Sequence, residues 1–250
     1  MIKTGIDHNK ILYLDIETVP IVHDFFELPT AMAIAWNSIH EIRYATEKDA
    51  SGELISAAAS FKKYAALFPE FAKIVCISLG YFKTETEFSV RAYYGTNEKE
   101  LLVNVGSAIT KASSQFKVLG GHNIKSFDIP FMIRRSTILD INLPPVFDLW
   151  GEKPWDLDSF LDTMEVWKCT ALYLGSSSLE SIAAAFGFKN PKEDMSGEMV
   201  STLYYLPTGP DFSKIGKYCN NDVVVSACVY VRMTKGDGVL KTIKIAENIV

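Results

Sequence analysis

The sequence has 250 residues, a formal net charge of −5, 48% apolar residues and 22% charged residues. This composition is typical of an ordinary globular protein, and the size fits a single large α/β domain over residues 1–250. The acidic balance argues weakly against a nucleic-acid partner, because such proteins usually carry a basic surface. The longest apolar stretch, VVVSACVYV at residues 223–231, is far shorter than the roughly 20 residues that span a bilayer, so we expect no membrane association.

The cysteines and the N-terminus indicate a cytoplasmic protein. The four cysteines, at positions 76, 169, 219 and 228, form no C-x-x-C pair. This scatter favours reduced thiols over a disulfide framework or a zinc site. The first ten residues contain no apolar run that would serve as a signal peptide.

The first half of the chain predicts strands and helices in alternation. Apolar, β-branched and aromatic runs predict three strands, at residues 11–16, 73–82 and 87–95. Ala-rich segments and a capping signal predict three helices, at 30–36, at 52–68, and from an N-cap at Asn97 to 112. A short polar link joins the second and third strands, which indicates an antiparallel hairpin.

The second half of the chain is mainly helical. FKVLGGHN, at residues 116–123, predicts a short buried strand that ends at a glycine pair, and residues 141–159 predict a long Pro-rich loop. Four helices are expected: 129–139, one N-capped by Ser177 with Glu180 in a capping box and closed by Gly187, 196–206, and one from Asp211 or Ser213 to Met233. This order predicts a mixed sheet covered by helices.

The first strand ends in two acids, in the stretch LYLDIETVP. Because side chains alternate between the faces of a strand, Asp15 and Glu17 project from the same face. Two like charges this close raise each other's pKa, and their burial without partners is costly. Three explanations are open. The end of the strand is exposed to solvent, a Lys or Arg neutralises the two acids, or the acids belong to a functional site.

Two further acidic positions join this pair. Asp128 follows the glycine-ended strand at the start of a helix, where it would cap the helix, favour the helix dipole or belong to the same site. Tyr218 and Asp222 are four residues apart, so they share one face of the last helix. Apolar neighbours on that face indicate that it points inward.

The three motifs in this order resemble those of a known superfamily. D-x-E, H-N-x-x-x-F-D-x-P and Y-x-x-x-D are similar to the motifs of the DEDD 3′–5′ exonucleases, in the DEDDy subgroup with tyrosine in the third motif. The alternative subgroup has His five residues before the last Asp, where this chain has Lys217. AALFPEFAKIVCISLGYF, WDLDSFLDTMEVWK and SLESIAAAFGFKNPKEDMSGEMV resemble bacterial stand-alone proteins related to the exonuclease domain of family-B DNA polymerases. The implied fold is α/β and ribonuclease H-like (DnaQ-like), with a mixed sheet of a five-stranded core flanked by helices.

The resemblance implies a metal-dependent 3′–5′ exonuclease that hydrolyses the terminal phosphodiester of single-stranded DNA and releases nucleoside monophosphates. Asp15, Glu17, Asp128 and Asp222 would hold two Mg²⁺ or Mn²⁺ ions, which prefer oxygen ligands. Asp15 would bridge both ions, Glu17 and Asp222 would hold the ion that carries the attacking water, and Asp128 would act through the water shell of the second. Tyr218 would orient that water, because a phenol with a pKa of about 10 is a poor base.

Other functions stay open. An exoribonuclease that trims RNA uses the same chemistry, and no stretch of the sequence clearly senses a 2′-hydroxyl. A nucleic-acid-binding module of the same fold that has lost catalysis is a different class, although all five site residues are present. A D-x-D-x-T phosphatase fits poorly, because Glu17 stands in place of the second Asp. The protein partner, if any, is not indicated.

Several neighbours of the motifs are secondary candidates. The resemblance places Thr18 near the terminal 3′-hydroxyl, and Asn123 and Phe127 beside Asp128 are candidate substrate contacts. For Phe127 a core position is an equal alternative, whereas for Asn123 a role in holding the loop is favoured over substrate contact. Weaker candidates are His122 in a structural role, Asp162 as a helix cap or supporting acid, Lys192 near a phosphate, one exposed residue of Arg134 and Arg135, and Trp150 and Trp155 as flanking aromatics or a small hydrophobic cluster.

Overall fold

A computed structural model describes residues 1–153, 157–169, 177–188 and 197–249. Six strands form one sheet in the order β5-β4-β1-β2-β3-β6. Their bounds are β1 Ile11–Pro20, β2 Ala72–Phe82, β3 Glu87–Tyr94, β4 Val118–Gly121, β5 Phe160–Asp162 and β6 Lys244–Ile249. β2 runs antiparallel to both β1 and β3, whereas β4 is parallel to β1, β5 to β4 and β6 to β3.

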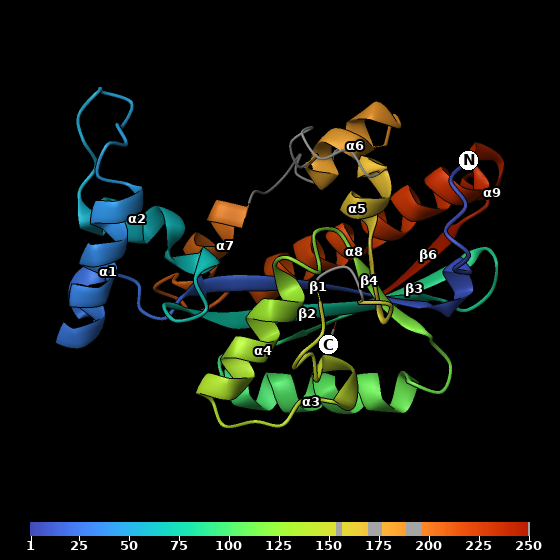
Figure 1. The fold of residues 1–250 in the computed structure, drawn as a ribbon, viewed down its shortest axis with the longest axis horizontal. Helices are drawn as coiled ribbons and strands as arrows, with labels where there is room; N and C mark the ends of the chain where they lie inside the picture. The colour runs from blue at the N-terminus through green and yellow to red at the C-terminus, as the bar shows by residue number, and fades with distance from the viewer. Residues whose placement is uncertain (154–156, 170–176, 189–196, 250) are drawn as a thin grey trace.

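Helices cover both faces of this sheet. Figure 1 shows α3 and α4 on one side and α8 on the other, with α1 and α2 at one end of the molecule. The helix bounds are α1 Thr30–Arg43, α2 Ala57–Tyr64, α3 Glu98–Ala112, α4 Asp128–Ile138, α5 Thr163–Lys168, α6 Leu179–Ala185, α7 Gly197–Tyr204, α8 Phe212–Lys235 and α9 Asp237–Leu240. Short 3-10 turns are η1 His8–Lys10, η2 Phe25–Glu27, η3 Ala65–Leu67 and η4 Pro145–Phe147. Among the described helices, none combines the length and the apolar character needed to cross a bilayer.

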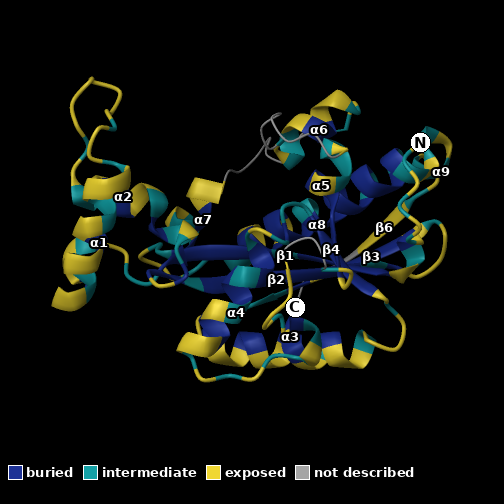
Figure 2. Ribbon diagram, viewed as in Figure 1, coloured by how far each residue is buried: buried dark blue, intermediate teal, exposed yellow. Residues whose placement is uncertain are grey.

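The alternation of side chains along β1 decides which face receives the acids. Leu12, Leu14 and Ile16 belong to the core cluster on the side of α3 and α4. Ile11 and Tyr13 belong to the cluster that contains the apolar residues of α8. By the two-residue period of a strand, Asp15 and Glu17 therefore face α8. Figure 2 shows the central strands and the middle of α8 buried.

A buried ion pair fixes α4 against α3 and the start of β2. Arg135 donates from Nε to Oε1 of Glu98 at 2.9 Å and from Nη2 to Oε2 at 2.6 Å, and from Nη1 to the carbonyl of Pro69 at 2.9 Å. Glu98 also accepts from the backbone N–H of Ile74 at 2.7 Å. Because the guanidinium and the carboxylate are both bonded in this way, the pair holds the helix that carries Asp128 in one orientation.

The predicted α/β fold, a mixed sheet flanked by helices, is confirmed and is consistent with a ribonuclease H-like fold. Two strands of the sheet, β5 and β6, have no counterpart among the strands predicted from the sequence. The hairpin of β2 and β3 and the N-cap at Asn97 are as predicted. Several boundaries were wrong. The first strand was predicted to end at residue 16, beside the two acids, but β1 continues to Pro20. The first helix continues to Arg43, residues 52–56 are not helical, and the N-cap of α6 is Ser178, whose Oγ accepts from the N–H of Ser181, rather than Ser177. Asp211 is the N-cap of α8.

Candidate active site

The middle of β1 presents Asp15 and Glu17 toward α8. Here the register between β1 and β2 shifts: Glu17 pairs with Cys76 and Thr18 with Ile74. Such irregularities are frequent beside active sites, where they turn side chains away from the regular alternation. Glu17 is buried, with 8% of its surface exposed, and Asp15 is half-buried. The predicted placement of both acids on one face agrees with the structure.

Asp128 reaches the same place from the opposite side of β1. β4 pairs with β1 only at residues 11–13, so the edge of β1 beyond Tyr13 is not paired with β4. The carboxylate of Asp128 accepts a hydrogen bond from the N–H of Ile16 at 3.0 Å, on the residue between the two β1 acids. Gly121 allows the chain leading to α4 to pass close to β1, because a Cβ at this position would lie 2.7 Å from the carbonyl oxygen of Leu14.

Tyr218 and Asp222 complete the group from α8. They lie one helical turn apart, and Tyr218 is buried with 7% of its surface exposed. Asp222 is also close to the other acids, because its negative charge raises the pKa values of Asp15, Glu17 and Asp128. Three separate elements, β1, α4 and α8, thus bring four carboxylates and one phenol together.

Burial is the main perturbation at this site. It raises the pKa of Asp15 well above its usual range, and the carboxylates of Asp128 and Asp222 raise this pKa further. Burial followed by the charges of Asp15 and Asp222 likewise raises the pKa of Glu17. Burial raises the pKa of Asp128 to about 8, against hydrogen bonds from backbone N–H groups that lower it. The acids therefore disfavour one another's ionised form unless a positive charge is supplied.

The pKa of the Tyr218 phenol is raised as well. Burial and then the charges of Asp222 and Glu17 raise its pKa above the usual value for tyrosine. Tyr218 therefore keeps its proton at neutral pH and can donate a hydrogen bond, but it is not a general base.

The donor set fits hard divalent cations. Within the described residues, no ion pair involves Asp15, Glu17 or Asp128. Buried anions of this kind cost several kcal/mol each unless they are compensated, and carboxylate oxygens are the ligands that Mg²⁺ and Mn²⁺ prefer. The group of Asp15, Glu17 and Cys219 has one ligand-type atom per residue, all within 4.8 Å of one another.

The candidate substrate residues are placed around this group. The hydroxyl of Thr18 donates to the carbonyl of Ala66 at 2.7 Å. Phe127 is half-buried and packs against Phe131, with ring centroids 5.3 Å apart. Asn123 has a left-handed backbone with φ of 60°, and its N–H donates to Asp162 at 2.9 Å. These contacts shape the loop before α4.

Asp162 connects this loop to β5. Its carboxylate caps α5 through the N–H of Met164 at 2.9 Å and also accepts from the N–H groups of Asn123 and Lys125. It also acts electrostatically on Asp128. Asp162 is thus the cap of α5, and it also lies close enough to Asp128 for its charge to raise the pKa of that acid. His122 bonds to Thr163 Oγ1 and to the carbonyl of Ser177, both at 2.9 Å, as expected for a structural role.

Some secondary expectations were wrong or lie outside the described residues. Trp150 is 96% exposed, so the small hydrophobic cluster expected around it is absent there. Of the two arginines, Arg134 is the exposed one, and Arg135 has the buried structural role given above. Trp155 and Lys192 lie outside the described residues.

Two cysteines at the site were not predicted. Cys219, next to Tyr218, donates from Sγ to the Oδ2 atom and to the carbonyl oxygen of Asp15, each at 3.4 Å. Cys76 lies across from Glu17 in the register of β1 and β2. Both are fully buried. A helical signal was available for Cys219, because it lies three residues before Asp222 and so shares its side of the helix.

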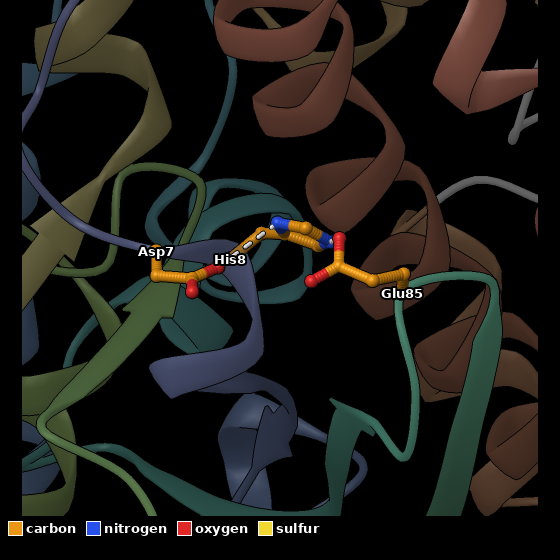
Figure 3. A group of neighbouring side chains, drawn as sticks. All are labelled: Asp7, His8 and Glu85. Carbon is orange, nitrogen blue, oxygen red and sulfur yellow. Dashed lines mark ion pairs between the residues drawn. The ribbon is translucent and has the colours of Figure 1, made fainter.

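A second acidic group, at the other end of β1, has a different character. The ring of His8 stands between the carboxylates of Asp7 and Glu85 (Figure 3), with Nδ1 3.2 Å from Asp7 and Nε2 3.4 Å from Glu85. One ligand-type atom of each of these residues lies within 4.8 Å of the others, but unlike the acids of the candidate site Asp7 and Glu85 are exposed. This group ties η1 to the turn between β2 and β3.

One comparison with known proteins identifies the family of this chain. A family model described as a predicted 3′–5′ exonuclease related to the exonuclease domain of PolB matches residues 66–250. This match spans well over half of the chain, so the chain belongs to that family, whose members are predicted hydrolases of phosphodiester bonds. The predicted resemblance to proteins related to the exonuclease domain of family-B DNA polymerases is thereby confirmed.

Solved structures include a polymerase that is similar to this chain. The family B DNA polymerase from the hyperthermophilic archaeon Pyrobaculum calidifontis is similar over 93% of this chain and 26% of its own, with a TM-score of 0.49 and 11% sequence identity. The chain thus spans about a quarter of the length of that polymerase. No curated protein matches the sequence.

Proposed function

We propose that this protein is a metal-dependent 3′–5′ exonuclease of the DEDDy type that removes nucleotides from the 3′ ends of single-stranded DNA and releases nucleoside monophosphates. The main support is that four carboxylates from β1, α4 and α8 lie close enough to act on one another's ionisation, with Glu17 and Asp128 buried and Asp15 and Asp222 half-buried. In the described structure, Asp15 and Asp128 have only hydrogen bonds to stabilise them, and the repulsion among the acids works against folding.

The proposed cofactors are two Mg²⁺ or Mn²⁺ ions. We assign Asp15 to both ions, Glu17 and Asp222 to one, and Asp128 to the water shell of the other. When bound, such ions supply the charge that balances these acids, an activated water and stabilisation of the phosphate charge. The four acids equal four of the five net negative charges of the chain, so the metal-loaded surface no longer opposes a nucleic acid.

Tyr218 is the proposed positioning group for the attacking water. Because the phenol stays protonated, it would donate a hydrogen bond to the water oxygen and direct a lone pair toward the phosphorus. The hydroxyl proton of Thr18 is already donated to Ala66, so the proposed contact of this residue with the terminal 3′-hydroxyl is through its main chain. Phe127 retains exposed surface on which a terminal base would stack, with Asn123 holding the loop behind it.

We also propose that residues 1–250 act as one exonuclease domain in the cytoplasm. Asp15 and Glu17 lie before the matched range of 66–250, whereas Asp128, Tyr218 and Asp222 lie inside it, so the proposed site needs both parts. Four free cysteines, one of them exposed, support a reducing compartment.

The test is digestion of 5′-end-labelled single-stranded DNA and RNA oligomers of matched sequence, with Mg²⁺, Mn²⁺ or EDTA. We expect DNA to shorten stepwise from its 3′ end with either metal and not in EDTA. Asp222→Asn should abolish this, and Asp158→Asn, the same change at an exposed position, should not. Faster digestion of RNA would favour an exoribonuclease, binding without digestion would favour a silent module, and metal-dependent digestion by Asp222→Asn would refute the proposed site.

A further inference from the structure

The candidate site contains a thiol, that of Cys219, beside the carboxylates. A metal site built only from oxygen ligands has no role for this sulfur. Cys219 lies on the side of α8 that faces β1, and none of its surface is exposed. Its Sγ lies 3.4 Å from Oδ2 of Asp15. Sγ of Cys219 and one carboxylate oxygen each of Asp15 and Glu17 all lie within 4.8 Å of one another.

Glu17 gives this group an independent reason to bind a cation. More than nine-tenths of its surface is buried, and it faces Asp15 and the thiols. Within the described residues, its carboxylate accepts no hydrogen bond and forms no ion pair. The ionised form of a carboxylate in this state is strongly disfavoured, so Glu17 either holds a proton or binds a cation that replaces it.

The spacing suits a tetrahedral ion with sulfur among its ligands. In a zinc site with a Zn–S distance of about 2.3 Å and a Zn–O distance of about 2.1 Å, the sulfur and oxygen ligands lie about 3.6 Å apart. The observed separation of 3.4 Å between Cys219 Sγ and Asp15 Oδ2 is close to that value. Octahedral Mg²⁺ has oxygen ligands about 2.1 Å from the ion and therefore about 3 Å apart, and it does not select sulfur.

We propose that this site also binds Zn²⁺, through Sγ of Cys219 and the carboxylates of Asp15 and Glu17, and that the zinc-bound protein is inactive. The thiol releases its proton to solvent as the sulfur binds the ion, and a water completes the coordination. Zinc in this position occupies the oxygens that we assign to Mg²⁺ or Mn²⁺, so the inhibition rests on the proposed function, whereas the binding site does not. The scattered cysteine spacing gave no signal for such a site.

Cobalt spectroscopy tests the binding site without any activity measurement. Co²⁺ takes the place of Zn²⁺ and gives a near-ultraviolet charge-transfer band only when a thiolate is bound to it. We expect this band in the parent protein and in Cys228→Ser, whose cysteine lies about 13 Å further along α8. We expect no band in Cys219→Ser or Cys219→Ala, and loss of the parent's band when Zn²⁺ is added. Circular dichroism confirms that each variant is folded.

Two spectroscopic results would overturn the proposal. One is absence of the band in the parent protein. The other is a band of full strength in a folded Cys219→Ser variant, which would assign the sulfur to Cys76 or to another thiol.

Inhibition is measured separately, as the Zn²⁺ concentration that halves the Mg²⁺-supported rate of each variant relative to its own rate without zinc. We expect Cys219→Ser to need at least about tenfold more Zn²⁺ than the parent or Cys228→Ser. Equal inhibition of all three would refute the inhibitory role. If the parent digests no nucleic acid with Mg²⁺ or Mn²⁺, the proposed function fails, and the cobalt band still decides whether the zinc site exists.

Discussion

Replacing Asp128 by asparagine should make the metal-free protein more stable, and increasingly so as the pH rises. The asparagine side chain would still offer an oxygen to the N–H of Ile16, which bonds to the present carboxylate at 3.0 Å, but would carry no charge. In the folded parent, burial raises the pKa of Asp128 to about 8. In the unfolded chain an aspartate has a pKa of about 3.9.

The sign follows from which state holds the proton more tightly. Because the folded state has the higher pKa, the stabilisation linked to this proton is fully present below about pH 4 and is lost as the pH rises toward about 8. Between these limits one such group lowers the free energy of unfolding by up to ~1.4 kcal/mol for each pH unit. The difference between variant and parent should therefore grow by about 2–3 kcal/mol from about pH 5 to about pH 7.

Urea denaturation in EDTA at these two pH values measures the difference directly. Asp158→Asn is the control, because it makes the same chemical change at an exposed position. A second arm adds Mg²⁺ at pH 7, which should stabilise the parent more than the Asp128 variant because the ion binds the ionised acids. If the difference in stability is the same at both pH values, Asp128 does not change its proton affinity on folding, and the reasoning from burial is wrong.

Three further substitutions separate the chemistry from the framework. Tyr218→Phe should slow 3′-end digestion about a hundredfold while Mn²⁺ affinity, measured by calorimetry, stays the same; a native rate would remove its positioning role. Arg135→Met should lower the free energy of unfolding by about 3–5 kcal/mol because it leaves a buried carboxylate unpaired, and exposed Arg134→Met should change it by less than about 0.5 kcal/mol; equal effects in urea would contradict the buried pair. Gly121→Ala should cost about 1–3 kcal/mol because its methyl would lie 2.7 Å from a β1 carbonyl oxygen, whereas Gly197→Ala, with open space around it, should be nearly neutral in thermal unfolding.

The parts of the site that sequence could predict are those set by local periodicity. Asp15 and Glu17 share a face because a strand alternates every two residues, and Tyr218 and Asp222 share one because a helix repeats every 3.6 residues. Both relations hold whatever the rest of the chain does. The resemblance of the motifs then supplied what periodicity cannot, namely that these two pairs and Asp128 meet.

The parts that could not be predicted depend on contacts between distant segments. The glycine pair predicts the end of β4, but no local pattern reports that β4 pairs with β1 only as far as Tyr13 or that Asp128 bonds to Ile16 beyond that point. Arg135 has the same spacing on α4 as many surface arginines, and its burial depends on Glu98 in another helix.

Short elements were missed for a related reason. β5 has three residues and β6 is a mixed polar and apolar segment at the sheet edge, so neither has a periodic pattern long enough to stand out. The N-cap of α6 was placed one residue early because the run of three serines at 176–178 offers equivalent capping groups, and only the backbone geometry distinguishes them.

Binding of Mn²⁺, followed by titration calorimetry at about pH 7.5, tests most directly whether the buried acids act together as a metal site. We predict that the parent and Asp158→Asn bind Mn²⁺ with the same affinity, and that Asp15→Asn weakens binding by about tenfold or more, since Asp15 is assigned to both ions. Equal affinity in all three proteins, or no binding by the parent, would contradict the account.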